Sequence, residues 1–256
     1  MVTEPLAPIP PLSPSLPPSR SLPPTPRQQA GVRVYAIGDV HGCDDRLEAM
    51  HQAVVAALAA RPVANPLLIH LGDYIDRGPK SAGVLERVAN PIPGAAGLVT
   101  ANLIGNHEDM LLNALDGGRR EAASHWLANG GGETLMSLGL SWRDQPARWA
   151  DGIPPRQLGL LRGLQTVLRV GAYVFVHAGL RPGVALQAQT REDMLWIREP
   201  FLSHDGPMQA VVVHGHTPGH EPTVLPHRIG VDTGAVLGGW LTCAVLEGDD
   251  VDFLQT

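Results

Sequence analysis

The chain is poor in cysteine and basic residues, and it contains no long apolar run. Cys43 and Cys243 are its two cysteines; their wide separation excludes a zinc-type pattern and predicts free thiols in a reducing, cytoplasmic compartment. No apolar run reaches the ~18 residues of a membrane span. The N-terminus lacks a charged region followed by an apolar core, so we expect neither a membrane segment nor a secretory signal.

What remains is an ordinary globular composition. The 256 residues are 44% hydrophobic and 17% charged, with a formal net charge of −6, which suits one large domain with a sizeable core. A nucleic-acid-binding protein needs a clustered basic face, and no run of Lys or Arg supplies one. We therefore expect no nucleic-acid partner.

Proline is concentrated at the N-terminus, where residues 1–30 hold ten of the 24 prolines. Because proline fixes φ and cannot donate to a strand ladder, these residues predict an extended, disordered tail. The tail is either a ligand for a partner that reads polyproline II helices or a leader without a fold. We predict a catalytic domain over residues 31–256.

Apolar runs and helical patterns alternate in the first half of this domain. Strand, helix, strand, helix, strand is a βαβ series, which predicts parallel strands with a site at their carboxyl ends. The second half is mostly β, so we predict an α/β fold in which two sheets pack face to face between helices. The predicted strands are 32–37, 66–71, 99–104, 165–170, 172–176, 209–213, 223–231, 240–247 and 251–254; the predicted helices are one beginning at the capping residues Asp44 and Asp45, 81–88, 108–115 and an insert over 117–163 that covers the site.

Five short segments place Asp, Asn or His beside glycine, each just after an apolar run. Carboxylate, amide and imidazole groups offered together from strand ends are enough to hold two divalent metal ions. Two metals side by side imply hydrolysis at phosphorus. The segments are Gly38-Asp39-Val40-His41-Gly42, Gly72-Asp73-Tyr74-Ile75-Asp76-Arg77-Gly78, Gly105-Asn106-His107-Glu108, His177-Ala178-Gly179 and His214-Gly215-His216-Thr217-Pro218.

The spacing of three of these residues predicts that they meet. Asp39, Asp73 and Asn106 are separated by about one βαβ unit each, so they should line up at neighbouring strand ends. Asp73 is central among them and is our candidate for the carboxylate that bridges two ions ~3.5–4 Å apart.

In this order, the segments resemble the signatures of the calcineurin-like metallophosphoesterases. Within that family they are most similar to the bacterial and phage branch of the PPP-type serine/threonine protein phosphatases. Trp126 with Asn129-Gly130-Gly131, and Asp232-Thr233-Gly234, are also similar to that branch. The resemblance covers residues 31–256, and five ordered motifs are far more specific than any one alone.

The resemblance implies a role for each motif residue. One metal would be held by Asp39, His41 and Asp73, and the other by Asp73, Asn106, His177 and His216. His107 would be the general acid, oriented by Asp76, while Arg77, Arg198 and Asn106 would bind the substrate phosphate. The implied reaction is in-line attack of a metal-bound hydroxide on a phosphomonoester. The implied cofactors are two divalent ions, manganese first, with iron or zinc as alternatives.

One position departs from the family pattern. The family has Arg before Gly-Asn-His-Glu, and this chain has Ile104, so a phosphate contact is either absent or supplied by Arg119, Arg120 or Arg181. Other residues keep two interpretations: Arg198 binds phosphate or forms a surface ion pair, Asp232 supports the site or caps a turn, and His214 supports a neighbouring ligand or has a structural role.

Three functions remain open at this point. The first is a phosphomonoesterase, foremost a serine/threonine protein phosphatase, acting on a phosphorylated protein or a small phosphoester. The second is a symmetrical dinucleoside tetraphosphatase. Glu108 and the Asp76-Arg77 pair favour the phosphatase, whereas the absence of Arg at position 104 favours the tetraphosphatase. The third is a silent metal-binding scaffold, against which the intact ligands, His107 and Arg77 argue.

Overall fold

A computed structural model describes residues 20–21, 31–117 and 120–256 of the chain. Of the predicted tail over residues 1–30, it includes Arg20–Ser21, which form a short edge strand, β1, antiparallel to β11 (Asp250–Gln255). The rest of the predicted tail lies outside the described residues.

The first sheet contains the predicted parallel strands. Its order is β1-β11-β10-β2-β3-β4, in which β2, β3 and β4 run parallel and β10 runs antiparallel to both β2 and β11. The βαβαβ prediction is confirmed, because helices connect β2 to β3 and β3 to β4. The strands are β2 (Val32–Ile37), β3 (Asn65–His70), β4 (Val99–Asn102) and β10 (Thr242–Glu247).

The second sheet has the order β5-β6-β7-β9-β8. The predicted strands 165–170 and 172–176 are present as the hairpin of β5 (Val167–Val170) and β6 (Tyr173–Val176), and β7 (Val211–His214) runs parallel to β6. The single strand predicted over 223–231 is wrong. The chain forms the hairpin β8 (Thr223–Leu225) and β9 (Arg228–Gly230), because Pro226 at the turn cannot donate to a ladder.

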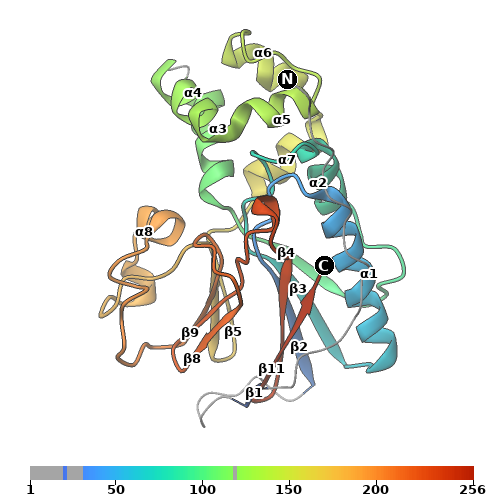
Figure 1. Ribbon diagram of the computed structural model, residues 1–256, viewed down its shortest axis with the longest axis vertical. Helices are drawn as coiled ribbons and strands as arrows, with labels where there is room; N and C mark the ends of the chain where they lie inside the picture. Colours follow the sequence, from blue (N-terminus) through green and yellow to red (C-terminus); the bar gives the residue numbers. More distant parts are fainter. Residues whose placement is uncertain (1–19, 22–30, 118–119) are drawn as a thin grey trace, which may run out of the picture.

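Helices cover the sheets and the carboxyl ends of the strands (Figure 1). Two helices flank the first sheet, a group of helices lies above the strand ends, and one lies beside the second sheet. The predicted insert over 117–163 is therefore confirmed as a helical layer. The helices are α1 (Asp44–Ala60), α2 (Ser81–Val88), α3 (Asn106–Gly117), α4 (Arg120–Trp126), the kinked segment η1 (Leu127–Gly131), α5 (Gly132–Ser137), α6 (Pro146–Gly152), α7 (Pro155–Gly163), the 3-10 turn η2 (Leu186–Ala188), α8 (Arg191–Trp196) and the 3-10 turn η3 (Ala235–Leu237).

Three hydrophobic layers follow from the alternation of side chains along the strands. In β2, Val34 and Ala36 pack into the layer between the two sheets, whereas Tyr35 and Ile37 pack against the helices on the opposite face. A third layer lies between the second sheet and the segment around α8, where Phe201 is buried. Because β2 is buried on both faces, it forms a rigid base for the loop that follows it.

The first turn of α1 differs from its prediction. Asp44 and Asp45 were expected to cap the helix, but both are inside it, and the N-cap residue is Cys43, without a side-chain cap. Asp44 instead accepts a hydrogen bond from Arg87 Nε at 2.8 Å. Asp44 therefore ties α1 to α2, and both acids still benefit from the positive end of the helix dipole.

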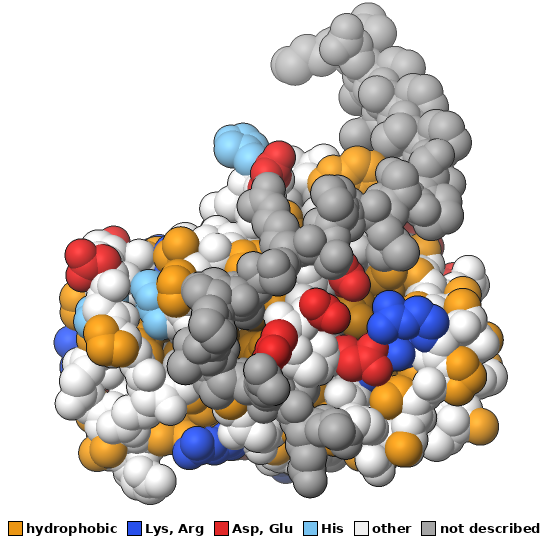
Figure 2. Space-filling model, turned by 90° about the horizontal axis from the view of Figure 1, so that it is seen from below, with side chains coloured by type: hydrophobic (Ala, Val, Ile, Leu, Met, Phe, Trp, Pro, Cys, Tyr) orange, Lys and Arg blue, Asp and Glu red, His pale blue; other side chains and the backbone are white. Residues whose placement is uncertain are grey.

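The end of the sheets away from the helical layer has a mixed surface. Figure 2 shows hydrophobic, acidic and basic side chains interspersed among the described atoms of this face. Within the described ranges, no helix is both long and apolar enough to cross a bilayer.

A buried histidine pair joins α1 to β3. The ring nitrogens His51 Nε2 and His70 Nε2 are 2.9 Å apart, and His70 Nδ1 lies 2.8 Å from Asn102 Oδ1. Since Asn102 Oδ1 accepts from His70 Nδ1–H, His70 Nε2 is the acceptor for His51 Nε2–H. Burial lowers the pKa of His51 to about 3 and that of His70 to about 4.

These two histidines should make stability depend on pH. Below the ordinary histidine pKa of ~6.5 the unfolded chain binds protons that the folded pair resists, so the free energy of unfolding falls as pH drops from there to about 4. We expect His51→Gln, which keeps a hydrogen-bond donor, to reduce this slope by about 1.4 kcal/mol per pH unit in urea unfolding. The exposed His220→Gln is the control, and an unchanged slope in His51→Gln would contradict the prediction.

Candidate metal centre

The predicted site residues meet at the carboxyl ends of five strands. Asp39 and His41 follow β2, Asp73 follows β3, Asn106 begins α3 after β4, His177 follows β6, and His216 follows β7. All of them are buried. The structure thus brings together every predicted ligand, although their role as ligands remains a prediction.

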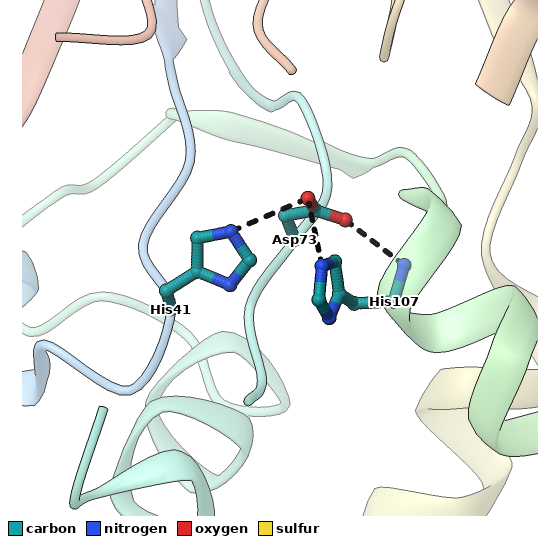
Figure 3. A group of neighbouring side chains, drawn as sticks. All are labelled: His41, Asp73 and His107. Carbon is teal, nitrogen blue, oxygen red and sulfur yellow. Dashed lines mark hydrogen bonds and ion pairs between the residues drawn. The ribbon is translucent and has the colours of Figure 1, made fainter. Parts of the chain in front are cut away.

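Asp73 lies at the centre of this cluster. Its Oδ2 is 3.4 Å from His41 Nε2, 3.4 Å from His177 Nε2 and 4.0 Å from His107 Nε2. Its Oδ1 accepts a hydrogen bond from the backbone N–H of His107 at 3.1 Å. Figure 3 shows His41 and His107 on either side of this carboxylate. One carboxyl oxygen is therefore held by backbone while the other faces three imidazoles.

The charges in the cluster are strongly coupled. Burial alone would raise the pKa of the Asp73 carboxyl, but the facing His177 and His107 hold it well below its usual range. Burial opposes charge on His177 too, yet Asp73 raises the pKa of His177 to about 10. Burial and the nearby Asp232 raise the pKa of Asp39. The cluster thus concentrates negative charge that a proton or a divalent cation can balance.

The imidazoles are oriented through their second nitrogens. His41 Nδ1 lies 2.8 Å from the carbonyl oxygen of Ile75, and His177 Nδ1 lies 3.0 Å from that of Leu71. Because a carbonyl only accepts, each Nδ1 carries a proton, and Nε2 is the ring nitrogen that faces the centre. Metal-binding histidines are held in this way.

The other two candidate ligands, Asn106 and Asp39, both contact His216. Asn106 Oδ1 lies 2.8 Å from His177 Nε2 and 3.0 Å from His216 Nδ1. Asp39 accepts the backbone N–H of His216 at 3.1 and 3.0 Å through its two oxygens. These contacts join the loop after β2 to the loop after β7, which comes from the other sheet.

Two glycines leave space for the carboxylates. A Cβ at Gly105 would lie 2.1 Å from Asp73 Oδ1, and a Cβ at Gly215 would lie 2.1 Å from Asp39 Oδ1. Any side chain at either position would displace a carboxyl oxygen. The glycines of the two motifs are therefore part of the site.

Backbone strain is concentrated in the same loops. The described non-glycine residues with left-handed φ angles are His41, Asp73, Asp76, Arg77 and His216. Each such residue costs on the order of 1–3 kcal/mol and persists only where its surroundings hold it. The strain is consistent with a site whose geometry takes precedence over local backbone preference.

The residues fit divalent metal ions. Two groups of potential ligand atoms each lie within 4.8 Å of one another, namely His41, Asp73 and His107, and Asp73, His177 and His216. His107 Nε2 and His216 Nε2 are buried without a hydrogen-bond partner among the described residues. Imidazole combined with carboxylate suits Mn, Fe or Zn. Asp73 belongs to both groups, as the bridging prediction requires.

The proposed acid and its orienting residue are in direct contact. His107 Nδ1 lies 2.7 Å from Asp76 Oδ2, and both side chains are fully buried. Because the carboxylate accepts from Nδ1–H, Nε2 is the atom of His107 that faces the cluster.

The candidate phosphate arginines lie at the rim. Arg77 is exposed and its Nη1 donates to His41 Nε2 at 2.9 Å. Arg198 is also exposed, and its charge acts on His216, whose pKa is lowered to about 3, mainly by burial. Ile104 is buried, with 2% exposed, and its backbone N–H donates to Gln165.

The possible substitutes for the missing arginine fare differently. Arg181 Nε donates to Asp193 at 2.9 Å, so its guanidinium is engaged in an ion pair within the α8 region. Arg120 is exposed at the start of α4, and Arg119 lies outside the described residues. Arg181 is thus a poor substitute for the phosphate-binding arginine that Ile104 replaces.

Two other predictions concern side chains next to the cluster. Asp232 Oδ1 accepts the backbone N–H of Gly234 at 2.9 Å and so caps a turn, and its carboxyl is also close enough to Asp39 to raise the pKa of that group. His214 is buried, and its ring centroid lies 5.0 Å from that of Phe201. This contact is with a core side chain, and the role of His214 stays a prediction.

Sequence reasoning missed the structural work of Glu108 and Thr134. The Glu108 carboxylate accepts backbone N–H groups from Gly105, Asp73, Tyr74 and Ile75 at 2.8–3.2 Å. It thereby joins the loops after β3 and β4. Its place in the Gly-Asn-His-Glu motif was a signal for this role, whereas Thr134, which contacts Asp76, lies in no segment with such a signal.

Two sheets packed face to face, with a carboxylate and imidazole cluster where their strands end, define a metal-dependent phosphoesterase. Residues 32–252 match the family described as calcineurin-like phosphoesterase, and the chain belongs to this family. The resemblance predicted from the five motifs is confirmed.

The relatives carry more than one name. The chain is 31% identical over 219 residues to serine/threonine-protein phosphatase 1 of Salmonella typhimurium, a match that covers 84% of this chain and 92% of the relative. It is 30% identical over 184 residues to the symmetrical bis(5'-nucleosyl)-tetraphosphatase of Acidovorax sp., covering 70% of this chain and 51%, about half, of that protein. These relatives belong to the same family and are named for two different substrates, a phosphoprotein and a dinucleoside tetraphosphate.

Solved structures agree on the fold. The crystal structure of a candidate diadenosine tetraphosphatase superposes with a TM-score of 0.61 at 23% identity, covering 89% of this chain and 98% of that one. At this identity the likeness supports the fold alone.

Removing the central charge should empty the site of metal. We expect Asp73→Asn, which keeps the acceptor for His107 N–H, to reduce bound manganese from about two ions per chain to nearly none, because both ions depend on this carboxylate. Metal analysis after loading and desalting measures this. Asp45→Asn, which removes an exposed partner of Lys80, is the control. Full metal content in Asp73→Asn, with an unchanged circular dichroism spectrum, would rule out the bridging role.

Proposed function

We propose that this chain is a two-metal phosphomonoesterase of the serine/threonine protein phosphatase type. The observation that carries the proposal is the buried His107, whose Nδ1 is fixed by Asp76 at 2.7 Å and whose Nε2 faces Asp73 at 4.0 Å. A metal-binding scaffold has no use for such a proton donor beside its ligands. A phosphoester hydrolase needs one for the leaving oxygen.

The ligands divide as the sequence motifs imply. Asp39, His41 and Asp73 would hold one ion; Asp73, Asn106, His177 and His216 would hold the other. Divalent ions in this cluster would lower the pKa of a water nucleophile and neutralise charge on the phosphoryl group. Manganese is the proposed metal, and iron or zinc suit the same donors.

The chain's own residues supply the other half of the reaction. Arg77, Arg198 and the Asn106 amide would hold the phosphoryl oxygens, with the two guanidinium groups binding through paired N–H donors. As an oxygen from water bonds to phosphorus, the bond from phosphorus to the leaving oxygen breaks, and the leaving oxygen takes the proton from His107 Nε2.

His107 is suited to carry that proton. Burial lowers its pKa, but the Asp73 and Asp76 carboxylates outweigh burial and raise the pKa above its ordinary value. These carboxylates stabilise the imidazolium form of His107, which is the form a general acid requires.

Similarity to the Salmonella protein phosphatase over most of both chains supports a phosphoprotein substrate. The Asp76-Arg77 pair and Glu108 support it as well, since the sequence motifs that contain them match the phosphatase branch.

A nucleoside polyphosphate is the second candidate substrate. A recess of about 540 Å³ beside the cluster is lined by Asp109, His125, Arg191, Glu192, Leu195 and Trp196. The Trp196 ring is 37% exposed, and its centroid lies 6.2 Å from that of His216. An exposed indole next to the centre offers a stacking surface for a base. The symmetrical tetraphosphatase relative and Ile104 favour the same alternative.

Replacing the proposed acid should separate chemistry from metal binding. We expect His107→Asn to lower kcat on phenyl phosphate with manganese by about 10²- to 10⁴-fold, because a positioned general acid contributes that much. Metal content should stay near two ions per chain, since His107 is not among the proposed ligands. Loss of metal in the variant would make His107 a ligand. No turnover of any phosphoester by the wild-type protein with any divalent ion would remove the enzyme and leave the scaffold.

Substrate choice can be decided by direct competition. We expect a phosphoserine peptide to have a higher kcat/KM than diadenosine tetraphosphate. Trp196→Ala should then change the peptide kcat/KM by less than about threefold, because a lone truncation at an exposed rim removes little binding energy. The opposite ranking, with a KM for the dinucleotide that rises in Trp196→Ala, would establish the second candidate.

A further inference from the structure

The helical insert makes its closest contacts with a single side chain of the catalytic loops. Asp76 Oδ2 accepts from Trp126 Nε1 at 2.8 Å as well as from His107, and Asp76 Oδ1 accepts from Thr134 Oγ1 at 2.6 Å. Trp126 and Thr134 are fully buried and come from α4 and α5. The carboxylate thus has donors on both oxygens, and two of its three donors come from the insert.

Thr134 also holds the backbone of Asp76. Its hydroxyl oxygen accepts the N–H of Asp76 at 2.8 Å while its proton is donated to the carboxylate. Asp76 has a φ of 72°, a conformation that a non-glycine residue keeps only when its neighbours hold it. Thr134 therefore fixes both the backbone and the carboxylate of Asp76, the residue that orients His107.

The turn between Trp126 and Thr134 reaches the next residue, Arg77. The backbone N–H of Arg77 donates to the carbonyl of Gly130 at 3.2 Å. Gly130 has a φ of 103°, and a Cβ there would lie 2.9 Å from Arg77 N. Gly130 is a non-helical kink in the segment that joins α4 to α5, and the chain approaches Arg77 at this kink. The insert thus contacts the orienting carboxylate and the phosphate arginine in one stretch.

We propose that Trp126 and Thr134 are positioning residues for leaving-group protonation. By fixing the Asp76 carboxylate they fix the direction of His107 Nδ1–H, and through the rigid ring they aim the proton on Nε2 at the leaving oxygen. The proposal rests on the proposed role of His107 as general acid. It assigns to α4, η1 and α5 a part in catalysis beyond covering the site.

Both residues could instead serve folding alone, since Trp126 also packs on Trp149 with ring centroids 5.6 Å apart. Leaving groups separate the two roles. A poor leaving group such as phenoxide needs its proton in the transition state, whereas 2,4-dinitrophenoxide departs without one. A misplaced acid therefore slows phenyl phosphate selectively, and a loosened fold slows both substrates.

The test compares kcat on phenyl phosphate and on 2,4-dinitrophenyl phosphate in the manganese-loaded full chain. Thr134→Val removes the hydroxyl that contacts the Asp76 carboxylate and backbone N–H, at nearly constant side-chain volume, and Trp126→Phe removes the indole N–H but keeps an aromatic ring. We expect each to lower kcat on phenyl phosphate by about 10- to 100-fold, the usual cost of losing an orienting partner, and kcat on the dinitrophenyl ester by less than about threefold. KM should stay unchanged, and Thr134→Ser, which retains the hydroxyl, should restore the wild-type ratio.

Trp149→Phe is the matched control. It removes an indole N–H from the same insert, where Trp149 Nε1 donates to the carbonyl of Ser141 at 2.9 Å, and should leave the ratio of the two rates unchanged. Equal losses on both substrates, or no loss, in Trp126→Phe and Thr134→Val would overturn the proposal. If His107→Asn itself shows no leaving-group dependence, the proposed acid fails, and that outcome is distinct from a failure of the insert variants alone.

Discussion

The buried carboxylate of Asp73 is the constraint on which the rest of the site depends. A carboxylate removed from water costs several kcal/mol unless positive charge surrounds it. Three imidazoles face its Oδ2, and the first turn of α3 donates a backbone N–H to its Oδ1. These partners come from both sheets, so the sandwich must close before the charge is balanced. Gly105 leaves room for the Asp73 carboxylate, and Glu108 holds the loops around it by accepting four backbone N–H groups.

The strain in these loops is offset by the layers beneath them. His41, Asp73 and His216 adopt left-handed backbone conformations after β2, β3 and β7, whose last three residues are buried. A close-packed interior resists deformation. Candidate ligand atoms held by such strands need little reorganisation when substrate binds, which is the condition under which electrostatic stabilisation of a transition state is most effective.

Local sequence patterns predicted the strands and the meeting of the ligands, because parallel strands end at one edge and each motif follows its own strand. β2 and α2 have the predicted bounds. The patterns failed where distant contacts decide. Asp44 leaves the cap position to pair with Arg87, and the Asp76–Thr134 contact spans 58 positions. Pro226 was a local signal for the β8–β9 turn, but the apolar residues on either side outweighed it.

The close approach of Gly130 to Arg77 constrains the evolution of the domain. Segments that only cover a site can be lengthened, replaced or lost when substrate specificity changes during evolution. A segment whose backbone abuts Arg77 and whose side chains grip Asp76 does not have that freedom. Within the helical layer, variation should therefore accumulate in α6 and α7, whereas α4, η1 and α5 should be inherited together with the strand-end motifs. Chimaeras that exchange specificity elements between relatives have a natural splice point after Ser137, at the end of α5.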